Sequence, residues 1–282
     1  MHRAMHFMIP YIPQPTLELG PLRVYSFGVL VAFGIFVGVQ VLKRRSVREG
    51  LDLDISGRML AWVLVGGFLG AHLVDRLVYF PSDTLADPWS LLRIWEGLSS
   101  FGGFLGAVVG AALFVRRHRA RLEGRAWRYV DAIAFALPFG WTIGRFGCFL
   151  AFDHPGKVTT FFLGQQYTDG FIRHNLGLEE ALYMIPVTVV IAALGQRSRP
   201  AGFFAGLLAV LYAPVRFLLE FLRIVDVRYA GLTPGQYGAI ALFVAGVILL
   251  IRSSRVRPAA GRPREDLGQP RRSPARALRP SR

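Results

Sequence analysis

Charged side chains inside long apolar stretches are the residues most able to do chemistry in this chain. Placing a charge at the centre of a bilayer costs roughly 2.5–3.5 kcal/mol on insertion scales, so such residues usually have a function. The candidates are His72, Asp75, Arg76, Arg145, Glu180, Arg216 and Glu220. Asp75 and Arg76 come near the end of their stretch, where they could reach the interface, so a structural role is equally reasonable for them.

Arg145 and Arg216 are the candidates for binding an anion. Arginine keeps its charge when buried and contacts phosphate oxygens in a bidentate manner. Arg145 stands between glycines, which allow a ligand or another backbone to approach closely. Two arginines on different helices beside lipid therefore predict a site for a phospholipid headgroup. In an alternative interpretation, Arg216 only pairs with Glu220, one turn later on the same helix face, and holds helices together.

The composition favours a membrane protein over a soluble one. Of the 282 residues, 53% are hydrophobic and only 18% are charged. The net charge of +15 comes from clusters between apolar stretches and from the C-terminal tail, so we expect no nucleic-acid partner. The single cysteine, Cys148, excludes an intramolecular disulfide. The sequence has no metal-ligand spacing and no nucleotide-binding loop, so we expect no metal and no cofactor.

Seven apolar stretches are long enough, or nearly so, to cross a bilayer as helices. A hydrocarbon core of about 30 Å takes about 20 helical residues. Helices are expected because a backbone that faces lipid must satisfy its own hydrogen bonds. The sequence thus predicts an all-α polytopic membrane protein, with spans at residues 24–41, 59–80, 100–115, 129–152, 178–194, 202–222 and 234–251.

Lysine and arginine counts predict the orientation of these spans. Twenty-three of these residues fall in the loops and tail of one side and seven on the other, which places the N-terminus outside and the C-terminus in the cytoplasm. The predicted transmembrane domain covers residues 1–257, and residues 258–282 form a disordered basic cytoplasmic tail. The outer loop 153–176 holds several aromatic residues and is expected to pack as a small cap over a site.

Several separated motifs between about residues 20 and 250 point to one family. The strongest is the arginine signature at residues 144–149 (GRFGCF), and another is the spacing of Tyr212, Arg216, Glu220 and Arg223 in the sixth span. The other segments are residues 20–28, 66–73, 95–103, 173–180 and 231–236. Together these motifs resemble those of the bacterial phosphatidylglycerol–prolipoprotein diacylglyceryl transferases.

The resemblance implies an enzyme of the bacterial inner membrane. It would transfer diacylglyceryl from phosphatidylglycerol to the thiol of a lipobox cysteine in a prolipoprotein signal peptide and release glycerol phosphate. Arg145 and Arg216 would hold the phosphate and stabilise the departing charge. The residues expected to bind substrate are Tyr25, Gly102, Gly103, Gly147, Glu180, Tyr212, Glu220 and Arg223.

The chain departs from the family pattern at the position of a residue that could take the proton from the substrate thiol. The family usually has a histidine at the position of Phe101, and a phenyl ring cannot accept a proton from the thiol. His174, Asp153 and His154 remain as candidate bases, each of which is also an ordinary type of loop residue. The chain is therefore identified as a diverged member. The alternatives are a homologue that acts on another acceptor and a non-catalytic phospholipid-binding protein.

Overall fold

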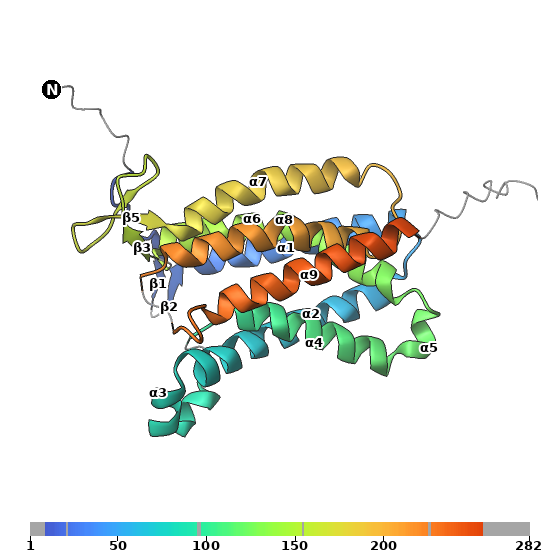
Figure 1. Cartoon of the computed structure of the whole chain (residues 1–282), viewed down its shortest axis with the longest axis horizontal. Helices are drawn as coiled ribbons and strands as arrows, with labels where there is room; N and C mark the ends of the chain where they lie inside the picture. Colours follow the sequence, from blue (N-terminus) through green and yellow to red (C-terminus); the bar gives the residue numbers. More distant parts are fainter. Residues whose placement is uncertain (1–8, 21, 95–96, 154, 225–226, 256–282) are drawn as a thin grey trace, which may run out of the picture.

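The computed structural model of the chain is a bundle of long helices with small irregular elements at its ends (Figure 1). It describes residues 9–20, 22–94, 97–153, 155–224 and 227–255. Seven helices of this described part are long and apolar enough to cross a membrane, which confirms the predicted all-α polytopic fold. They are α1 (Ser26–Arg48), α2 (Leu53–Val74), α4 (Ser100–Arg117), α6 (Ala126–Ala151), α7 (Leu176–Leu194), α8 (Phe203–Leu219) and α9 (Pro234–Arg255).

Two of these spans continue as short helices of another type. A π-helix, η1 (Asp75–Tyr79), prolongs α2, and a 3-10 helix, η3 (Glu220–Leu222), prolongs α8. The predicted spans at residues 59–80 and 202–222 therefore reach about where the sequence placed their ends. π-helical turns are frequent at functional sites.

Glycines decide how closely the helices pack. The helix α2 lies along α4, and α1 lies along α6. A Cβ added to Gly70 of α2 would lie 2.5 Å from the carbonyl oxygen of Gly102 in α4, and one added to Gly34 of α1 would lie 2.6 Å from that of Gly140 in α6. In both pairs the backbones are in direct contact, as small residues permit in membrane helices.

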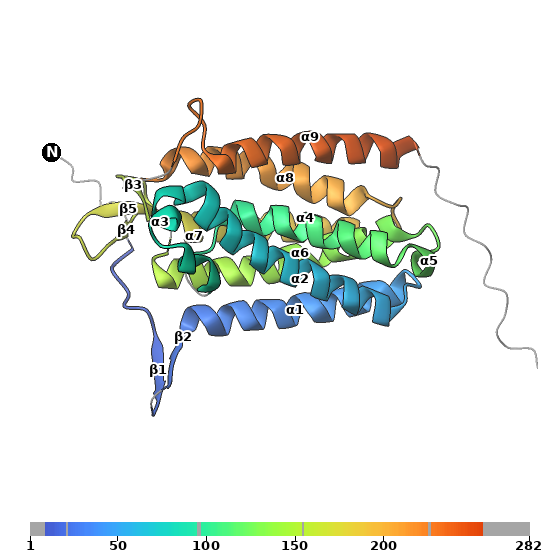
Figure 2. The same ribbon diagram turned by 90° about the horizontal axis from the view of Figure 1, so that it is seen from below.

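Short elements gather at the end of the bundle where α7 begins (Figures 1 and 2). A hairpin of β1 (Thr16–Leu19) and β2 (Leu22–Tyr25) leads into α1. The expected cap is a three-stranded antiparallel sheet in the order β3-β5-β4, made of β3 (Pro155–Val158), β4 (Gln165–Gln166) and β5 (Ile172–Asn175). The segment between η1 and α4 holds α3 (Pro81–Ala86) and η2 (Pro88–Leu92). The short helix α5 (Arg119–Leu122), which follows α4, lies at the opposite end of the bundle.

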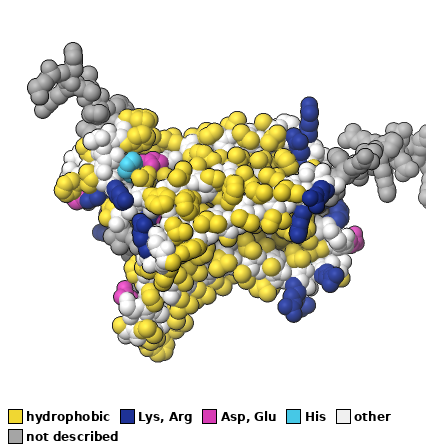
Figure 3. Space-filling model, viewed as in Figure 1, with side chains coloured by type: hydrophobic (Ala, Val, Ile, Leu, Met, Phe, Trp, Pro, Cys, Tyr) yellow, Lys and Arg dark blue, Asp and Glu magenta, His cyan; other side chains and the backbone are white. Residues whose placement is uncertain are grey.

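The outer surface of the helices is apolar, whereas basic side chains collect at one end (Figure 3). Val29, Phe33 and Phe36 of α1 are among the exposed large hydrophobic residues. This surface suits lipid, because a bilayer offers no reason to bury such side chains. The predicted tail at residues 258–282 lies outside the described residues, as do His154 and residues 95–96.

Candidate functional site

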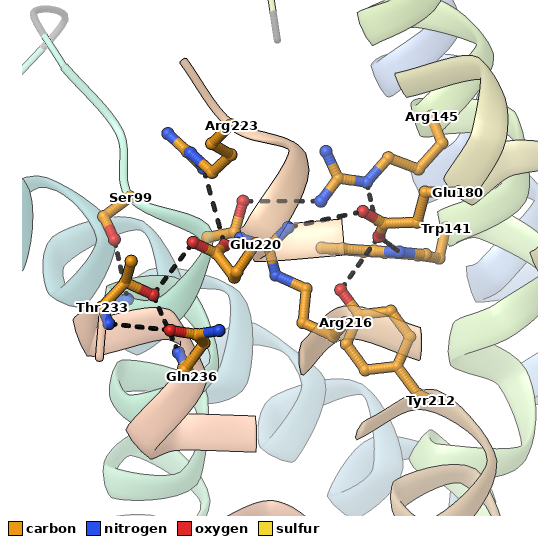
Figure 4. Close-up of polar contacts among 12 residues, drawn as sticks. Ser99, Trp141, Arg145, Glu180, Tyr212, Arg216, Glu220, Arg223, Thr233 and Gln236 are labelled. Atoms are coloured by element: carbon orange, nitrogen blue, oxygen red, sulfur yellow. Dashed lines mark hydrogen bonds and ion pairs between the residues drawn. The ribbon is translucent and has the colours of Figure 1, made fainter. Parts of the chain in front are cut away.

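The two arginines singled out in the sequence meet at one carboxylate, that of Glu180 (Figure 4). Arg145 of α6 donates from Nε to Glu180 Oε1 at 2.8 Å, and Arg216 Nη1 of α8 lies 3.8 Å from Oε2. All three side chains are buried, with exposed fractions of 4% for Arg145, 8% for Arg216 and 1% for Glu180. Charges from α6, α7 and α8 therefore converge inside the bundle.

Two neutral donors complete the contacts of Glu180. Trp141 Nε1 and the Tyr212 hydroxyl donate to Oε1 at 3.0 Å and 2.9 Å. Each stands one turn before its arginine on the same helix, since residues four apart share a face. The Arg145 guanidinium also lies over the Trp141 ring, 4.9 Å from its centroid. Sequence reasoning missed Trp141, although its spacing from Arg145 pointed to it.

A second carboxylate, that of Glu220, extends the network toward α9. It forms an ion pair with Arg216, and its Oε1 lies 3.7 Å from Arg223 Nη1. Thr233, just before α9, donates from Oγ1 to Glu220 Oε2 at 3.0 Å. The Arg216–Glu220 pair of the alternative interpretation is thus present. Arg216 nevertheless lies between two carboxylates, so its contacts extend beyond a single pair.

The central cluster is defined as Arg145, Glu180, Arg216, Glu220 and Arg223. Its three arginines face two glutamates among the described residues. The Arg145 Nε donates to Glu180. Its terminal nitrogens make longer contacts with neutral groups: Nη2 lies 3.5 Å from Ser100 Oγ, and Nη1 lies 3.7 Å from Cys148 Sγ. These long contacts leave the outer edge of the guanidinium suited to a ligand anion.

The N-terminus of α4 adds to the positive potential at Arg145. Ser100 is the first residue of α4, and the Ser99 side chain caps the helix by accepting from Gly102 N at 3.3 Å. The backbone N–H groups at a helix start carry partial positive charge and favour anions. The sequence analysis did not single out Ser99 or Ser100, because their position beside α6 depends on how the helices pack.

The candidate bases lie toward the cap. His174 of β5 has Nδ1 2.6 Å from Glu179 Oε1, and its ring stacks on Phe161 with centroids 5.7 Å apart. Asp153 is exposed directly after α6, and His154 lies outside the described residues. Phe101 instead packs against α9, because a Cβ added to Gly238 would collide with its ring. Cys148 is buried within α6.

The predicted glycine contacts are occupied by neighbouring helices. Gly102 and Gly103 face Gly70 and Ala71 of α2, and Gly147 packs against Phe27 of α1. Helix packing therefore accounts for these glycines, and a contact with substrate stays a prediction.

Tyr25 is separate from this packing. It stands at the N-cap position of α1 and is 48% exposed. Its predicted contact with the headgroup likewise stays a prediction.

His72, Asp75 and Arg76 form a buried group at the base of the segment that holds α3 and η2. Asp75 and His72 are buried, and Arg76 Nε lies 3.8 Å from Asp75 Oδ2. His72 Nε2 lies 3.1 Å from the carbonyl oxygen of Leu91. The Asp75 carboxylate is thus largely enclosed by protein. A structural role for Asp75 and Arg76 stays a prediction.

Known proteins match the chain over most of its length. A family model described as prolipoprotein diacylglyceryl transferase matches residues 14–252. A protein of Tolumonas auensis named phosphatidylglycerol–prolipoprotein diacylglyceryl transferase is 30% identical over 247 residues, which is 85% of this chain and 95% of the relative. Proteins of the same name from Chromohalobacter salexigens and Nitratidesulfovibrio vulgaris are 33% identical, over 87% and 86% of this chain and 94% of each relative.

Proposed function

Because this chain belongs to the prolipoprotein diacylglyceryl transferase family, we propose that it transfers a diacylglyceryl group from phosphatidylglycerol to the thiol of a lipobox cysteine in prolipoproteins. Glycerol phosphate is the leaving group. The chain is a multi-pass protein of the bacterial inner membrane, as its seven apolar helices and its family indicate. The names of its relatives do not favour another acceptor or a non-catalytic role.

The observation that carries the proposed site is that Arg145 and Arg216, from different helices, meet at the buried carboxylate of Glu180. The phosphodiester of phosphatidylglycerol carries one negative charge, which these two guanidinium groups would bind. Arg145 offers its terminal nitrogens beside the N-terminus of α4, and Arg216 lies across Glu180 from it. Two planar guanidinium groups fixed by shared carboxylates suit bidentate binding of phosphate oxygens.

The reaction needs a cation where the leaving group departs. The thiolate sulfur forms a bond to the glycerol carbon that bears the phosphate ester, and the bond from that carbon to oxygen breaks. The electron pair stays on the phosphate oxygen, so negative charge grows there as glycerol phosphate leaves. Arg145 and Arg216, already held in place, would stabilise this charge without reorganisation in the transition state.

We assign the proton transfer to His174, oriented by Glu179. Only the thiolate is a strong nucleophile, so a base must take the thiol proton. His174 has a short contact to a carboxylate, 2.6 Å from Nδ1 to Glu179 Oε1. Such a contact fixes the tautomer and leaves Nε2 to accept the proton. Asp153, exposed after α6, is the second candidate.

The proposed substrate contacts follow from the same geometry. Tyr212 donates to Glu180 inside the cluster and would keep that carboxylate in place when lipid binds. Arg223, at the end of η3, would contact the outer oxygens of the headgroup. Tyr25 at the start of α1 would reach the headgroup from the other side of α6.

Reconstitution tests the proposed function directly. The protein is placed in vesicles of phosphatidylglycerol and given a synthetic lipobox peptide, and the peptide mass is measured. We expect a gain that equals one diacylglyceryl group, together with release of glycerol phosphate. No mass gain, in vesicles where a characterised transferase modifies the same peptide, would reject the proposal.

A further inference from the structure

Three aromatic rings form a layer one helical turn from the polar groups of the site. The ring centroids of Phe104 (α4), Trp141 (α6) and Tyr212 (α8) lie 5.2 Å apart for Phe104–Trp141, 5.4 Å for Phe104–Tyr212 and 6.2 Å for Trp141–Tyr212. Aromatic pairs attract one another at these distances. Each ring shares a helix face with a site residue four positions away. These site residues are Ser100, Arg145 and Arg216.

This layer, which we call the aromatic floor, lies on the side of the site away from the cap. The helix α6 leads into the cap, so Trp141 is farther from the cap than Arg145. On the other side of the floor, Phe104 and Trp141 pack against an apolar cluster that includes Met184 and Val187. An anion among such side chains would lose its hydration without gaining partners. The floor therefore keeps a bound phosphate at the level of the arginines.

Trp141 is in contact with Arg145 both directly and through Glu180. Its Nε1 donates to Glu180 Oε1 at 3.0 Å, and the same oxygen accepts from Arg145 Nε at 2.8 Å (Figure 4). The indole ring faces the Arg145 guanidinium, whose Cζ lies 4.9 Å from the ring centroid. The guanidinium thus has one edge on the carboxylate and one face on the ring, so turning it would break at least one of these contacts.

We propose that Trp141 is a positioning residue for the transfer reaction, which holds Arg145 with its terminal nitrogens directed at the lipid phosphate. This inference rests on the proposed function, because it concerns the arginine that binds the leaving group. Arg145 Nη2 lies 3.5 Å from Ser100 Oγ, and Nη1 lies 3.7 Å from Cys148 Sγ. Phosphate oxygens would replace these long contacts with charge-assisted hydrogen bonds, which are stronger.

Positioning by Trp141 should strengthen phosphate binding without any contact between the indole and the lipid. A long side chain that is mobile before binding loses rotamer freedom when it binds, and this loss weakens affinity. Trp141 and Glu180 already restrict Arg145 in the folded protein. A donor that is fixed in this way also needs no reorganisation as negative charge grows on the departing phosphate.

Comparing phosphatidylglycerol with diacylglycerol of the same acyl chains tests this role, because only the first lipid carries a phosphate. Native mass spectrometry of the purified protein gives the ratio of the two affinities. We expect Trp141→Leu to lower this ratio by about tenfold or more, since the N–H bond to a carboxylate and the ring contact are lost together. Trp141→Phe keeps a ring in the floor and should lower the ratio less, by about threefold.

Trp127→Leu is the matched control for these variants. Trp127 belongs to the same helix, near its other end, and is 49% exposed. We expect this variant to keep the ratio of the unmodified protein.

A double-variant cycle shows whether Trp141 acts through Arg145. Adding Trp141→Leu to Arg145→Gln should lower the ratio no further than Arg145→Gln alone, because two changes to one interaction are not additive. Additive losses, or a loss of affinity that is equal for both lipids, would show a structural role and overturn the inference.

The same measurement separates this inference from the proposed function. A ratio that falls in Arg145→Gln but stays unchanged in both Trp141 variants would overturn the role of Trp141 and leave the proposed function intact. A ratio that stays unchanged in Arg145→Gln itself would overturn both.

Discussion

Glu180 holds the central cluster together because both Arg145 and Arg216 approach its carboxylate. Four donors converge on its two oxygens, and the side chain is almost fully buried. Removing one partner of a buried ion pair leaves an uncompensated charge, which is strongly destabilising. At the scale of single residues, this shared carboxylate controls both the stability and the geometry of the site.

Glu180→Gln should therefore lower stability more than the same change at the neighbouring position. We expect a loss of about 3–5 kcal/mol in the free energy of unfolding, because two buried arginines lose their common counter-charge. Glu179→Gln is the matched control, since Glu179 pairs with His174 outside the cluster. Thermal midpoints of both variants in detergent check this, and equal midpoints would contradict the account of Glu180.

Arg145→Lys should lower kcat/KM although it keeps the positive charge. A lysine ammonium cannot contact two phosphate oxygens in the planar manner of a guanidinium. We expect a loss of about tenfold to a hundredfold, the range for one or two charge-assisted hydrogen bonds. The reconstituted transfer assay measures it, with Arg197→Lys at the distant loop as the control. A rate within twofold of the unmodified protein would show that Arg145 acts as a point charge only.

His174→Asn should slow transfer most at a pH where the substrate thiol is protonated. Asparagine keeps a similar size but cannot accept the thiol proton, so the variant depends on thiolate that is already present. Its rate should therefore approach the rate of the unmodified protein as the pH rises and the thiol ionises by itself. The reconstituted transfer assay at several pH values measures this. An unchanged rate in His174→Asn, with a lowered rate in Asp153→Asn, would assign the proton transfer to Asp153 instead.

The sequence predicted that Arg145 and Arg216 would lie close together, but it did not predict that both would contact Glu180. Intramembrane charge singles out Arg145, Glu180, Arg216 and Glu220 because burial makes each of them costly. It says nothing about distances between helices, so the sharing of Glu180 had to come from the fold. The sequence analysis did not identify Ser100 and Thr233 as site residues for a related reason. Neutral hydroxyls are common, and these two gain their partners only when α4 and α9 pack against α6 and α8.

At the scale of elements, the glycines of α2 and α4 set the position of the α4 N-terminus. Gly66 and Gly70 face Gly106 and Gly110 so closely that any side chain would meet backbone. This packing places Ser100 beside Arg145. It also brings the partial positive charge of the α4 N-terminus close to that arginine. The close packing of these glycines thus supports anion binding, because it fixes the position of α4.

Gly70→Ala should destabilise the protein and also weaken transfer. The new Cβ would lie 2.5 Å from the Gly102 carbonyl oxygen, and such overpacking typically costs about 1–3 kcal/mol. Gly38→Ala in α1 is the control, since nothing lies within 4 Å of its added Cβ. Thermal midpoints and transfer rates of the two variants check this, and equal behaviour would contradict the packing account.

The spans were predictable as elements, whereas the small structures at their ends were not. An apolar stretch of this length has few alternatives in a bilayer. Their ends were less well defined: α1 continues to Arg48 past the basic Lys43 and Arg44, since charged residues extend a helix readily outside the hydrocarbon. Short segments such as β4 and η2 have too few residues for any periodic pattern, and β4 is defined by its pairing with β5.

At the scale of the whole molecule, basic side chains at one end and the cap at the other give the bundle a polarity (Figures 1 and 3). From the positive-inside rule we predict that the basic end lies in the cytoplasm and the cap outside. This orientation would put the central cluster's side of the bundle, where α7 begins, toward the compartment that receives exported prolipoproteins.

Thiol labelling of intact cells tests this orientation. Thr168→Cys in the cap and Glu123→Cys after α5 each add one exposed cysteine at opposite ends, and the native Cys148 is buried. We expect a reagent that cannot cross the inner membrane to label the cap cysteine and to spare the other until the cells are lysed. Labelling in the reverse order would place the N-terminus inside.

Binding of phosphatidylglycerol compared with diacylglycerol of the same acyl chains tests the central claim most directly, because the two lipids differ only in the phosphoglycerol group. Native mass spectrometry of the purified protein measures both affinities. The account predicts that the protein prefers phosphatidylglycerol, and that Arg145→Gln and Arg216→Gln each remove most of this preference while diacylglycerol binds as before. A preference that survives in both variants would contradict the claim that these two guanidinium groups hold the phosphate.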